Sequence, residues 1–293
     1  MKYHESVLVE EVIDYLQPEK GKSFIDATIG GGGHTAELIK RGSKVLGIDR
    51  DEEAVEHVRE NQKLNIKNKK LMLVKANFNQ IEETAVKYGF NQVDGILFDL
   101  GVSSNQLNKG ERGFSFQKEG PLDMRMDKNL PIKASDIVNN LEERRLSEIF
   151  SSYAEEKFSW PIARAICGAR QIKPITETKE LADLVREVYR KKRFRTKVDP
   201  ATKVFQALRI VINSELLNLE ETLPQTTKIL RKGGRLVIIS YHSLEDSIVK
   251  RFFKASIKLK VLTAKPVGPQ EIEIKRNPRS RSAKLRAAEK IIN

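Results

Sequence analysis

The stretch Ile25-Asp26-Ala27-Thr28-Ile29-Gly30-Gly31-Gly32-Gly33-His34 leads from an apolar segment through an acid into four consecutive glycines. Glycine tolerates positive φ and allows close approach to the backbone, so such a loop after a strand is typical of a nucleotide-type cofactor site. A second apolar segment ends at Asp49, 19 positions after Gly30. An acid at this spacing lies where it can accept hydrogen bonds from both hydroxyls of a ribose.

Three acids distinguish the candidate cofactors better than the glycines do, because a dinucleotide site has the same glycine-to-acid spacing. Asp26 precedes the glycines, where a carboxylate repels a pyrophosphate but attracts the cationic amino end of S-adenosylmethionine. Asp99 follows a further apolar segment, where a fourth parallel strand would deliver it to a reacting methyl group. Phe78 is a candidate to cover the adenine. The set favours S-adenosylmethionine, although each acid taken alone fits a helix N-cap about as well.

Apolar segments alternate with helical periodicity along the first third of the chain. This alternation indicates βαβ units with right-handed crossovers and therefore an α/β, doubly wound (Rossmann-like) sheet. The expected strands lie at 23–27, 44–48, 71–75 and 93–98, and the expected helices at 8–16, 35–40, 52–63 and 80–88. A fifth strand is expected at 235–240 after a helix ended by Gly233-Gly234, a sixth at 258–262, and a closing edge strand through Ala283, Leu285 and Ala287.

The pattern breaks after Asp99. Residues 105–133 are rich in Gly, Asn, Asp and Lys, and helical segments follow at 135–153, 156–170 and 178–192. Asp199-Pro200 then opens a helix that leads back into the sheet. We therefore expect a cofactor-binding domain of residues 1–107 and 203–293, interrupted by an α-helical substrate-recognition domain of residues 108–202. An insertion after the fourth strand belongs over the carboxyl ends of the strands, as a substrate lid.

The net charge of +13 is concentrated in two short runs. Residues 190–203 and 274–290 each hold seven Lys or Arg against one acid. Two such patches favour a polyanion, most simply a nucleic acid, although a solvated basic helix face or an anionic membrane surface also fits. The candidate contacts are Arg190, Lys191, Lys192, Arg193, Arg195, Arg279, Arg281, Lys284 and Arg286.

The composition indicates the cellular compartment and the class of protein. A 39% hydrophobic content supports a sizeable core, and the single cysteine forms no internal disulfide, which fits a reducing cytoplasm. No segment resembles a signal peptide or approaches the length needed to cross a bilayer, so we expect a cytoplasmic protein without a membrane partner. No His, Cys and Asp spacing resembles a metal site.

Eight stretches, in order along the chain, resemble the RsmH (MraW) family of bacterial ribosomal RNA methyltransferases. They are His4-Glu5-Ser6-Val7-Leu8, Asp26 to His34, Gly47-Ile48-Asp49-Arg50-Asp51, Phe98 to Leu107, Arg112-Gly113-Phe114-Ser115-Phe116, Pro121 to Asp127, Ser240-Tyr241-His242-Ser243-Leu244-Glu245-Asp246 and Asn277 to Arg286.

The resemblance implies a class I methyltransferase that moves a methyl group from S-adenosylmethionine to the exocyclic N4 of one cytosine. The cytosine belongs to the decoding region of 16S rRNA in the small ribosomal subunit, so DNA is not an expected partner. Family cofactor contacts correspond to Gly32, Gly33, His34, Asp49, Phe78, Asp99 and Gln106. Asp26 joins this set from the charge argument alone.

The catalytic group is less clearly marked. Amino-methylating enzymes usually carry Asp/Asn/Ser-Pro-Pro-aromatic, whereas this chain reads Asp99-Leu100-Gly101-Val102, without prolines or a ring. Asp99 is the candidate acceptor for the amino hydrogens of the base, and a role limited to contacting the cofactor stays equally open. Tyr241, Phe114 and Phe116 are candidates to stack the base, or core residues. His242 either bonds within its own loop or touches RNA.

Three other functions remain compatible with the sequence. An NAD-type oxidoreductase would share the strand and acid spacing. A non-catalytic ribosome assembly factor would use the basic runs and keep a relic pocket. A DNA cytosine-N4 or adenine-N6 methyltransferase is disfavoured mainly by the absent Pro-Pro motif. The oligomeric state is not indicated.

Overall fold

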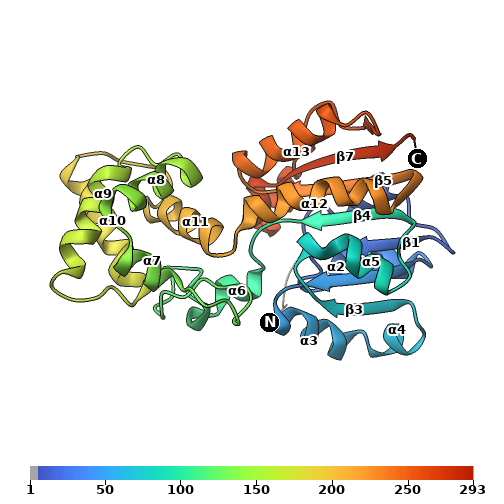
Figure 1. Cartoon of the computed structure of the whole chain (residues 1–293), viewed down its shortest axis with the longest axis horizontal. Helices are drawn as coiled ribbons and strands as arrows, with labels where there is room; N and C mark the ends of the chain where they lie inside the picture. Colours follow the sequence, from blue (N-terminus) through green and yellow to red (C-terminus); the bar gives the residue numbers. More distant parts are fainter. Residues whose placement is uncertain (1–5, 293) are drawn as a thin grey trace. The chain divides into compact units, whose positions relative to one another are not determined.

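The computed structural model describes residues 6–292, in two compact units (Figure 1). One unit holds the residues up to Ser103 and those from Leu216 onward, and the other is Ser104–Glu215. The second unit extends beyond the expected 108–202 segment at both ends, because it includes helices α6 (Ser104–Asn108) and α11 (Ala201–Ile212). His4 and Glu5 of the first family motif lie outside the described residues.

The first unit is built on a seven-stranded sheet with the order β3-β2-β1-β4-β5-β7-β6. Adjacent strands from β3 to β5 run parallel, and β7 is antiparallel to both of its neighbours. The strands are β1 (Ser23–Asp26), β2 (Lys44–Asp49), β3 (Leu71–Lys75), β4 (Val93–Asp99), β5 (Leu230–Ser240), β6 (Leu259–Val261) and β7 (Lys284–Lys290). This is the predicted α/β, doubly wound class of sheet.

Successive side chains of a strand point to opposite faces of the sheet, and here both faces carry apolar side chains. Helices therefore cover both faces. Phe24 and Val45 pack with helices α1 (Val9–Leu16), α2 (Gly33–Lys40) and α3 (Glu52–Asn61). Ile25 and Leu46 pack on the other face with η1 (Phe78–Gln80), α5 (Ile81–Lys87), α12 (Glu215–Ile229) and α13 (Ser243–Ala255). The remaining short elements of this unit are α4 (Lys63–Lys67), α14 (Glu271–Arg276) and η3 (Pro278–Ser282).

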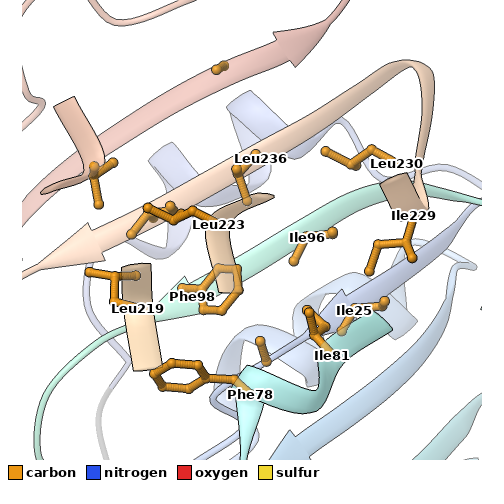
Figure 2. Close-up of a cluster of buried hydrophobic side chains, with 14 of the residues drawn as sticks. Ile25, Phe78, Ile81, Ile96, Phe98, Leu219, Leu223, Ile229, Leu230 and Leu236 are labelled. Atoms are coloured by element: carbon orange, nitrogen blue, oxygen red, sulfur yellow. The ribbon is translucent and has the colours of Figure 1, made fainter. Parts of the chain in front are cut away.

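Figure 2 shows the second of these clusters, in which β4 provides the centre. Ile96 and Phe98 point from β4 toward Leu219 and Leu223 of α12 and toward Ile81 of α5. Ile96 and Phe98 are fully buried. Burial of this apolar surface holds β4, and with it the position of Asp99 at the end of the strand.

Two predictions for the C-terminal strands are wrong. The strand through Leu285 is not an edge, because β7 lies between β5 and β6, and its residues are buried on both faces rather than alternating. Gly233 and Gly234 do not end a helix, because α12 ends at Ile229 and β5 begins at Leu230. Gly233, with φ 80°, lies where β5 shifts register against β4. The glycine pair therefore makes a strand irregularity.

The second unit is helical. It contains α6, η2 (Gly110–Arg112), α7 (Ala134–Asn140), α8 (Glu143–Ala154), α9 (Ser159–Arg170), α10 (Thr178–Lys191) and α11. The helix expected at 135–153 is two helices, because Leu141 and Glu142 have extended backbone angles. Asp199 opens α11 as predicted, since its Oδ1 accepts from the Ala201 N–H at 3.0 Å.

The irregular stretch between η2 and α7 is fixed by a buried guanidinium. Arg112 is 2% exposed and donates to the carbonyl oxygens of Arg125 and Met126 at 3.1 and 2.9 Å. The Asn213 amide also bridges this stretch, accepting from the Met126 N–H and donating to the Met124 carbonyl, both at 2.8 Å. Across residues 6–292, no helix combines the length and the apolar character needed to span a membrane.

Truncation of Ile96 tests the packing that holds β4. Ile96→Ala leaves a cavity beneath the sheet and should lower the free energy of unfolding by about 2 to 5 kcal/mol. Val86→Ala is the matched control, because Val86 is 59% exposed on α5 of the same unit and should change stability by less than about 0.5 kcal/mol. Urea unfolding followed by circular dichroism measures both, and equal losses would contradict the packing described.

Candidate active site

Three carboxylates are brought to one edge of the sheet by its topology. Asp26, Asp49 and Asp99 are the last residues of β1, β2 and β4, three parallel strands adjacent in the order β2-β1-β4. Parallel strands end at the same edge, which is where ligands bind in open α/β sheets. The acids identified from the sequence therefore lie on one rim.

Asp26 is the most deeply placed of the three, at 1% exposure. Its Oδ2 accepts from the Thr35 hydroxyl at 2.7 Å, and its Oδ1 accepts from the Thr28 N–H at 3.4 Å. Burial raises the pKa of Asp26 above its ordinary value, against the opposing influence of His34 and of these hydrogen bonds. Asp26 thus ties the glycine-containing loop to the first turn of α2.

Asp49 holds the same loop from the neighbouring strand. Its Oδ2 accepts from the Gly30 N–H and its Oδ1 from the Asp51 N–H, both at 2.9 Å. Burial raises the pKa of Asp49 to about 6, and the two backbone hydrogen bonds only partly oppose this rise. Each carboxylate oxygen retains a further lone pair for the two hydroxyls of a ribose.

The glycines are required by φ and by close contacts. Gly32 caps α2 with φ 76°, and a Cβ there would lie 3.0 Å from Cγ2 of Val58. Gly33 begins α2, and a Cβ at this position would lie 2.1 Å from Oγ of Ser6. A side chain at either position would displace α2 from its neighbours, so both positions require glycine.

His34 is 5% exposed in the first turn of α2. Its Nε2 lies 2.9 Å from the carbonyl oxygen of Val7, and a carbonyl accepts only, so Nε2 carries the hydrogen. Its Nδ1 lies 3.9 Å from Oδ2 of Asp99. The imidazole is therefore held in one orientation beside the Asp99 carboxylate.

Asp99 is held from two sides. Its N–H donates to Oγ1 of Thr28 at 2.6 Å, and its Oδ1 accepts from the Tyr241 hydroxyl at 2.7 Å. The sequence interpretation missed the contacts of Thr28 and Thr35 with the acids, and no spacing signals them. It considered Tyr241 as a stacking residue, without its bond to Asp99.

The other predicted cofactor residues are placed as follows. Phe78 is 9% exposed and packs edge-to-face on Phe98, with ring centroids 5.7 Å apart (Figure 2). Its ring therefore contributes to the core, and its contact with an adenine stays a prediction. Gln106 is 6% exposed in α6, within the second unit.

The candidate stacking residues differ in exposure. Phe114 is 7% exposed, and Phe116 packs edge-to-face on Phe205 at a centroid distance of 5.0 Å. Tyr241 is partly buried against the core on the α1 face of the sheet. His242 bonds within its own loop, as one of the two interpretations expected: Nδ1 accepts from the Glu245 N–H at 3.4 Å, and Nε2 lies 3.1 Å from Oε1 of Glu245.

The first basic run lies at the end of α10 and in the loop after it. Arg190 and Lys191 both form ion pairs with Glu187, at 2.7 and 3.5 Å, which balances part of their charge. Lys192, Arg193 and Arg195 are exposed. Arg190 and Lys191 are exposed as well, so all five residues predicted in this run are accessible.

The second run is divided between the surface and the sheet. Arg279 and Arg281 are exposed in η3, and Lys284 is partly exposed at the start of β7. Arg286 is 7% exposed, with Nε and Nη2 bound to the two carboxylate oxygens of Asp246 at 2.6 and 3.1 Å. The prediction that Arg286 contacts RNA is set aside, because its guanidinium is buried and paired.

These features define a class of protein: an α/β enzyme domain that binds a nucleotide-type cofactor at an anionic, glycine-lined sheet edge. The chain belongs to the MraW methylase family, whose model matches residues 1–291. This confirms the family resemblance seen in the sequence.

Relatives match along their whole lengths. Ribosomal RNA small subunit methyltransferase H of Carboxydothermus hydrogenoformans is 45% identical, covering 98% of both chains. The enzyme of the same name from Halothermothrix orenii is also 45% identical, over 100% of both chains. Among solved structures, an rRNA methylase from Streptococcus thermophilus matches with 12% identity and a TM-score of 0.47, covering 97% of this chain and 96% of that one.

S-adenosylmethionine is the cofactor of this methylase family, and the residues of the site fit it. The sheet edge presents three carboxylates beside a loop of bare glycine backbone. A sulfonium and an ammonium on one ligand are attracted by such an edge, whereas the phosphates of a dinucleotide are repelled. The contacts expected from the sequence stay predictions: Asp49 with the ribose, Asp26 and His34 with the amino acid end, and Gly32 and Gly33 through their backbone.

The raised pKa of Asp49 predicts that cofactor affinity depends on pH, if this carboxylate binds the ribose. Ribose hydroxyls donate to the ionised carboxylate, so binding must release a proton wherever Asp49 is protonated, below about pH 6. Between pH 7.5 and 5 the affinity for S-adenosylhomocysteine should fall by on the order of tenfold. Calorimetric titrations across this range measure the loss.

The control for this experiment is Asp49→Asn, which cannot ionise. Its affinity should be lower than that of the wild type at pH 7.5 and should change less as the pH falls. A wild-type affinity that is the same at pH 5 and pH 7.5 would contradict the assignment of Asp49 to the ribose.

Proposed function

We propose that this protein methylates the exocyclic N4 of a specific cytosine in the decoding region of 16S rRNA, within the small ribosomal subunit. The relatives that match over their whole lengths carry the name ribosomal RNA small subunit methyltransferase H. The observation that carries the choice of an amino nitrogen is the Asp99 carboxylate, fixed at the end of β4 by Thr28 and Tyr241. A fixed carboxylate is suited to accepting hydrogens from an amino group.

Cytosine N4 needs such help because its lone pair is delocalised into the ring. S-adenosylmethionine supplies an activated methyl group on a sulfonium. Asp99 accepts an N4–H hydrogen bond, which turns the lone pair out of the ring plane and stabilises the positive charge that develops on nitrogen. We propose the Asp99 carboxylate also as the acceptor of the proton that N4 loses.

The RNA would be held by phosphate contacts from the exposed basic residues. Lys192, Arg193 and Arg195 on the second unit and Arg279, Arg281 and Lys284 on the first are the proposed set, with Arg190 and Lys191 contributing what Glu187 leaves unbalanced. A target cytosine in a helix must leave its stack to reach the sheet edge, so an unpaired or easily opened site is expected. Because the proposed substrate is ribosomal RNA, we expect the methylation to take place in the cytoplasm.

The base and its position are tested by mass spectrometry of ribosomal RNA from cells with and without the gene. We expect N4-methylcytidine at one decoding-region position to disappear in the deletion strain and to return with the wild-type gene. Loss of a methyl group from another base, or from the large-subunit RNA, would overturn the proposed substrate.

Asp99→Asn separates its two possible roles. If Asp99 acts on the base, turnover with RNA should fall by about a hundredfold or more, while the affinity for S-adenosylhomocysteine changes little. Single-turnover transfer of labelled methyl groups and calorimetry measure the two quantities. A loss confined to cofactor affinity would assign Asp99 to the cofactor instead.

Neutralising the first basic run tests the RNA surface. Replacing Lys192, Arg193 and Arg195 with glutamine should weaken RNA binding and reduce the slope of log affinity against log salt by about two. The same change at Lys63, Lys67 and Lys70, which are exposed on and beside α4, is the matched control. Filter binding at several salt concentrations measures the slopes. An equal reduction in both variants would show that Lys192, Arg193 and Arg195 are not part of the RNA interface.

A further inference from the structure

The Asp99 carboxylate has a partner that faces it from the neighbouring strand. β4 and β5 are paired in parallel, with Asp99 opposite Ile239, and lie side by side in Figure 1. Tyr241 follows two residues after Ile239, and its hydroxyl donates to Oδ1 of Asp99 at 2.7 Å. Burial, together with the Asp99 carboxylate, raises the pKa of Tyr241 well above its ordinary value. The hydroxyl therefore stays protonated and remains a donor at neutral pH.

The backbone of Tyr241 is itself fixed. Its N–H donates to Oε2 of Glu245 at 2.9 Å, in the first turn of α13. Glu245 is 2% exposed, and its own N–H donates to Nδ1 of His242. The start of α13 thus holds the loop that carries the tyrosine, so the phenol is presented to Asp99 in one position.

The ring of Tyr241 is seated against the backbone that follows Asp99. Gly101 has φ 107°, and a Cβ placed on it would lie 3.2 Å from Cδ2 of Tyr241. The chain therefore has a glycine where the ring comes closest to the strand end, and a side chain there would press on the ring. The Tyr241 side chain thus packs with its ring against Gly101 and binds Asp99 through its hydroxyl.

Oδ1 and Oδ2 of Asp99 are consequently distinguished. Tyr241 engages Oδ1, while Oδ2 is the oxygen turned toward Nδ1 of His34, 3.9 Å away. A carboxylate held by a donor on one oxygen loses rotational freedom and presents the other oxygen in a defined direction. This preorganisation is what a hydrogen-bond acceptor for a reacting amino group requires.

We propose that Tyr241 is a positioning residue for methyl transfer: its hydroxyl anchors Oδ1 of Asp99 and so aims the carboxylate at the amino group of the target base. This inference rests on the proposed role of Asp99. It assigns to a tyrosine directly after β5 the orienting function that the Asp99-Leu100-Gly101-Val102 stretch lacks in its own sequence. The bond balance of the reaction is unchanged, because Tyr241 keeps its proton throughout.

Tyr241→Phe is the direct test, because it keeps the ring against Gly101 and removes only the hydroxyl. We expect kcat to fall by about tenfold to a hundredfold, the effect of losing one hydrogen bond to a charged group. The KM for S-adenosylmethionine and the calorimetric affinity for S-adenosylhomocysteine should stay within about twofold of wild type, because the Tyr241 hydroxyl is not among the predicted cofactor contacts.

Tyr15→Phe is the matched control. Tyr15 is also partly buried against the core on the α1 face of the sheet, and it lies on α1 in the same unit. This variant should turn over at the wild-type rate. Thermal unfolding of both variants checks that each is folded at the assay temperature.

The assay uses small subunits from cells that lack the gene, with methyl transfer followed by label from S-adenosylmethionine. It needs only that the wild type transfers label, and nucleoside analysis of the product tests the proposed base separately. A wild-type kcat in Tyr241→Phe would overturn the positioning role. So would a loss shared by Tyr15→Phe, or a loss that appears only as weaker cofactor binding, since each would indicate a merely structural effect.

A second variant gives the same test without touching the hydroxyl. Gly101→Ala presses a methyl group onto the Tyr241 ring and should lower kcat in the wild-type background. In the Tyr241→Phe background the same substitution should cost less, because the hydrogen bond that it disturbs is already gone. Fully additive losses in the double variant would contradict the proposal.

Discussion

Parallel pairing of β1 with β2 and β4 places Asp26, Asp49 and Asp99 on one edge of the sheet, and the chemistry proposed for the chain depends on how these carboxylates are held. Three acids on one rim repel one another and lose hydration. The fold offsets part of this cost with hydrogen-bond donors from the backbone and from hydroxyls, next to the attraction of Arg50 and His34.

The hydrogen bonds of the three acidic residues also connect the elements that carry them. Asp49 binds the N–H of Gly30 after β1, Asp26 binds the Thr35 hydroxyl in α2, and Thr28 accepts from the N–H of Asp99. A shift of any one of these elements breaks a bond to a neighbour. The core beneath β4 and the loop above it thus act together to fix the position of the acids, as expected of a preorganised site.

Local sequence signals predicted most of the sheet but not its C-terminal part. The strands that end in acids are short apolar runs closed by turn residues, and the structure has them where expected. The position of β7 between β5 and β6 depends on long-range pairing, which no local pattern encodes. Gly233 was misread because glycine is common both after helices and at strand irregularities, and only the register against β4 distinguishes these.

The same division holds for the site. The acids were recognisable because each ends a strand. The contacts of Thr28 and Tyr241 with Asp99 become visible only when strands distant in sequence are paired, and that of Thr35 with Asp26 only when α2 is placed against β1. The burial of Arg286 beside Asp246 likewise could not be read from a basic run, because a run of charge does not say which members face inward.

The most direct measurement of the central claim, that the anionic edge of the sheet holds a cationic nucleoside cofactor, is calorimetric titration of S-adenosylmethionine into the folded protein, with NADH titrated in parallel. We expect saturable heat at one site per chain for S-adenosylmethionine and none for NADH. Folded protein that binds NADH and gives no heat with S-adenosylmethionine would contradict the claim.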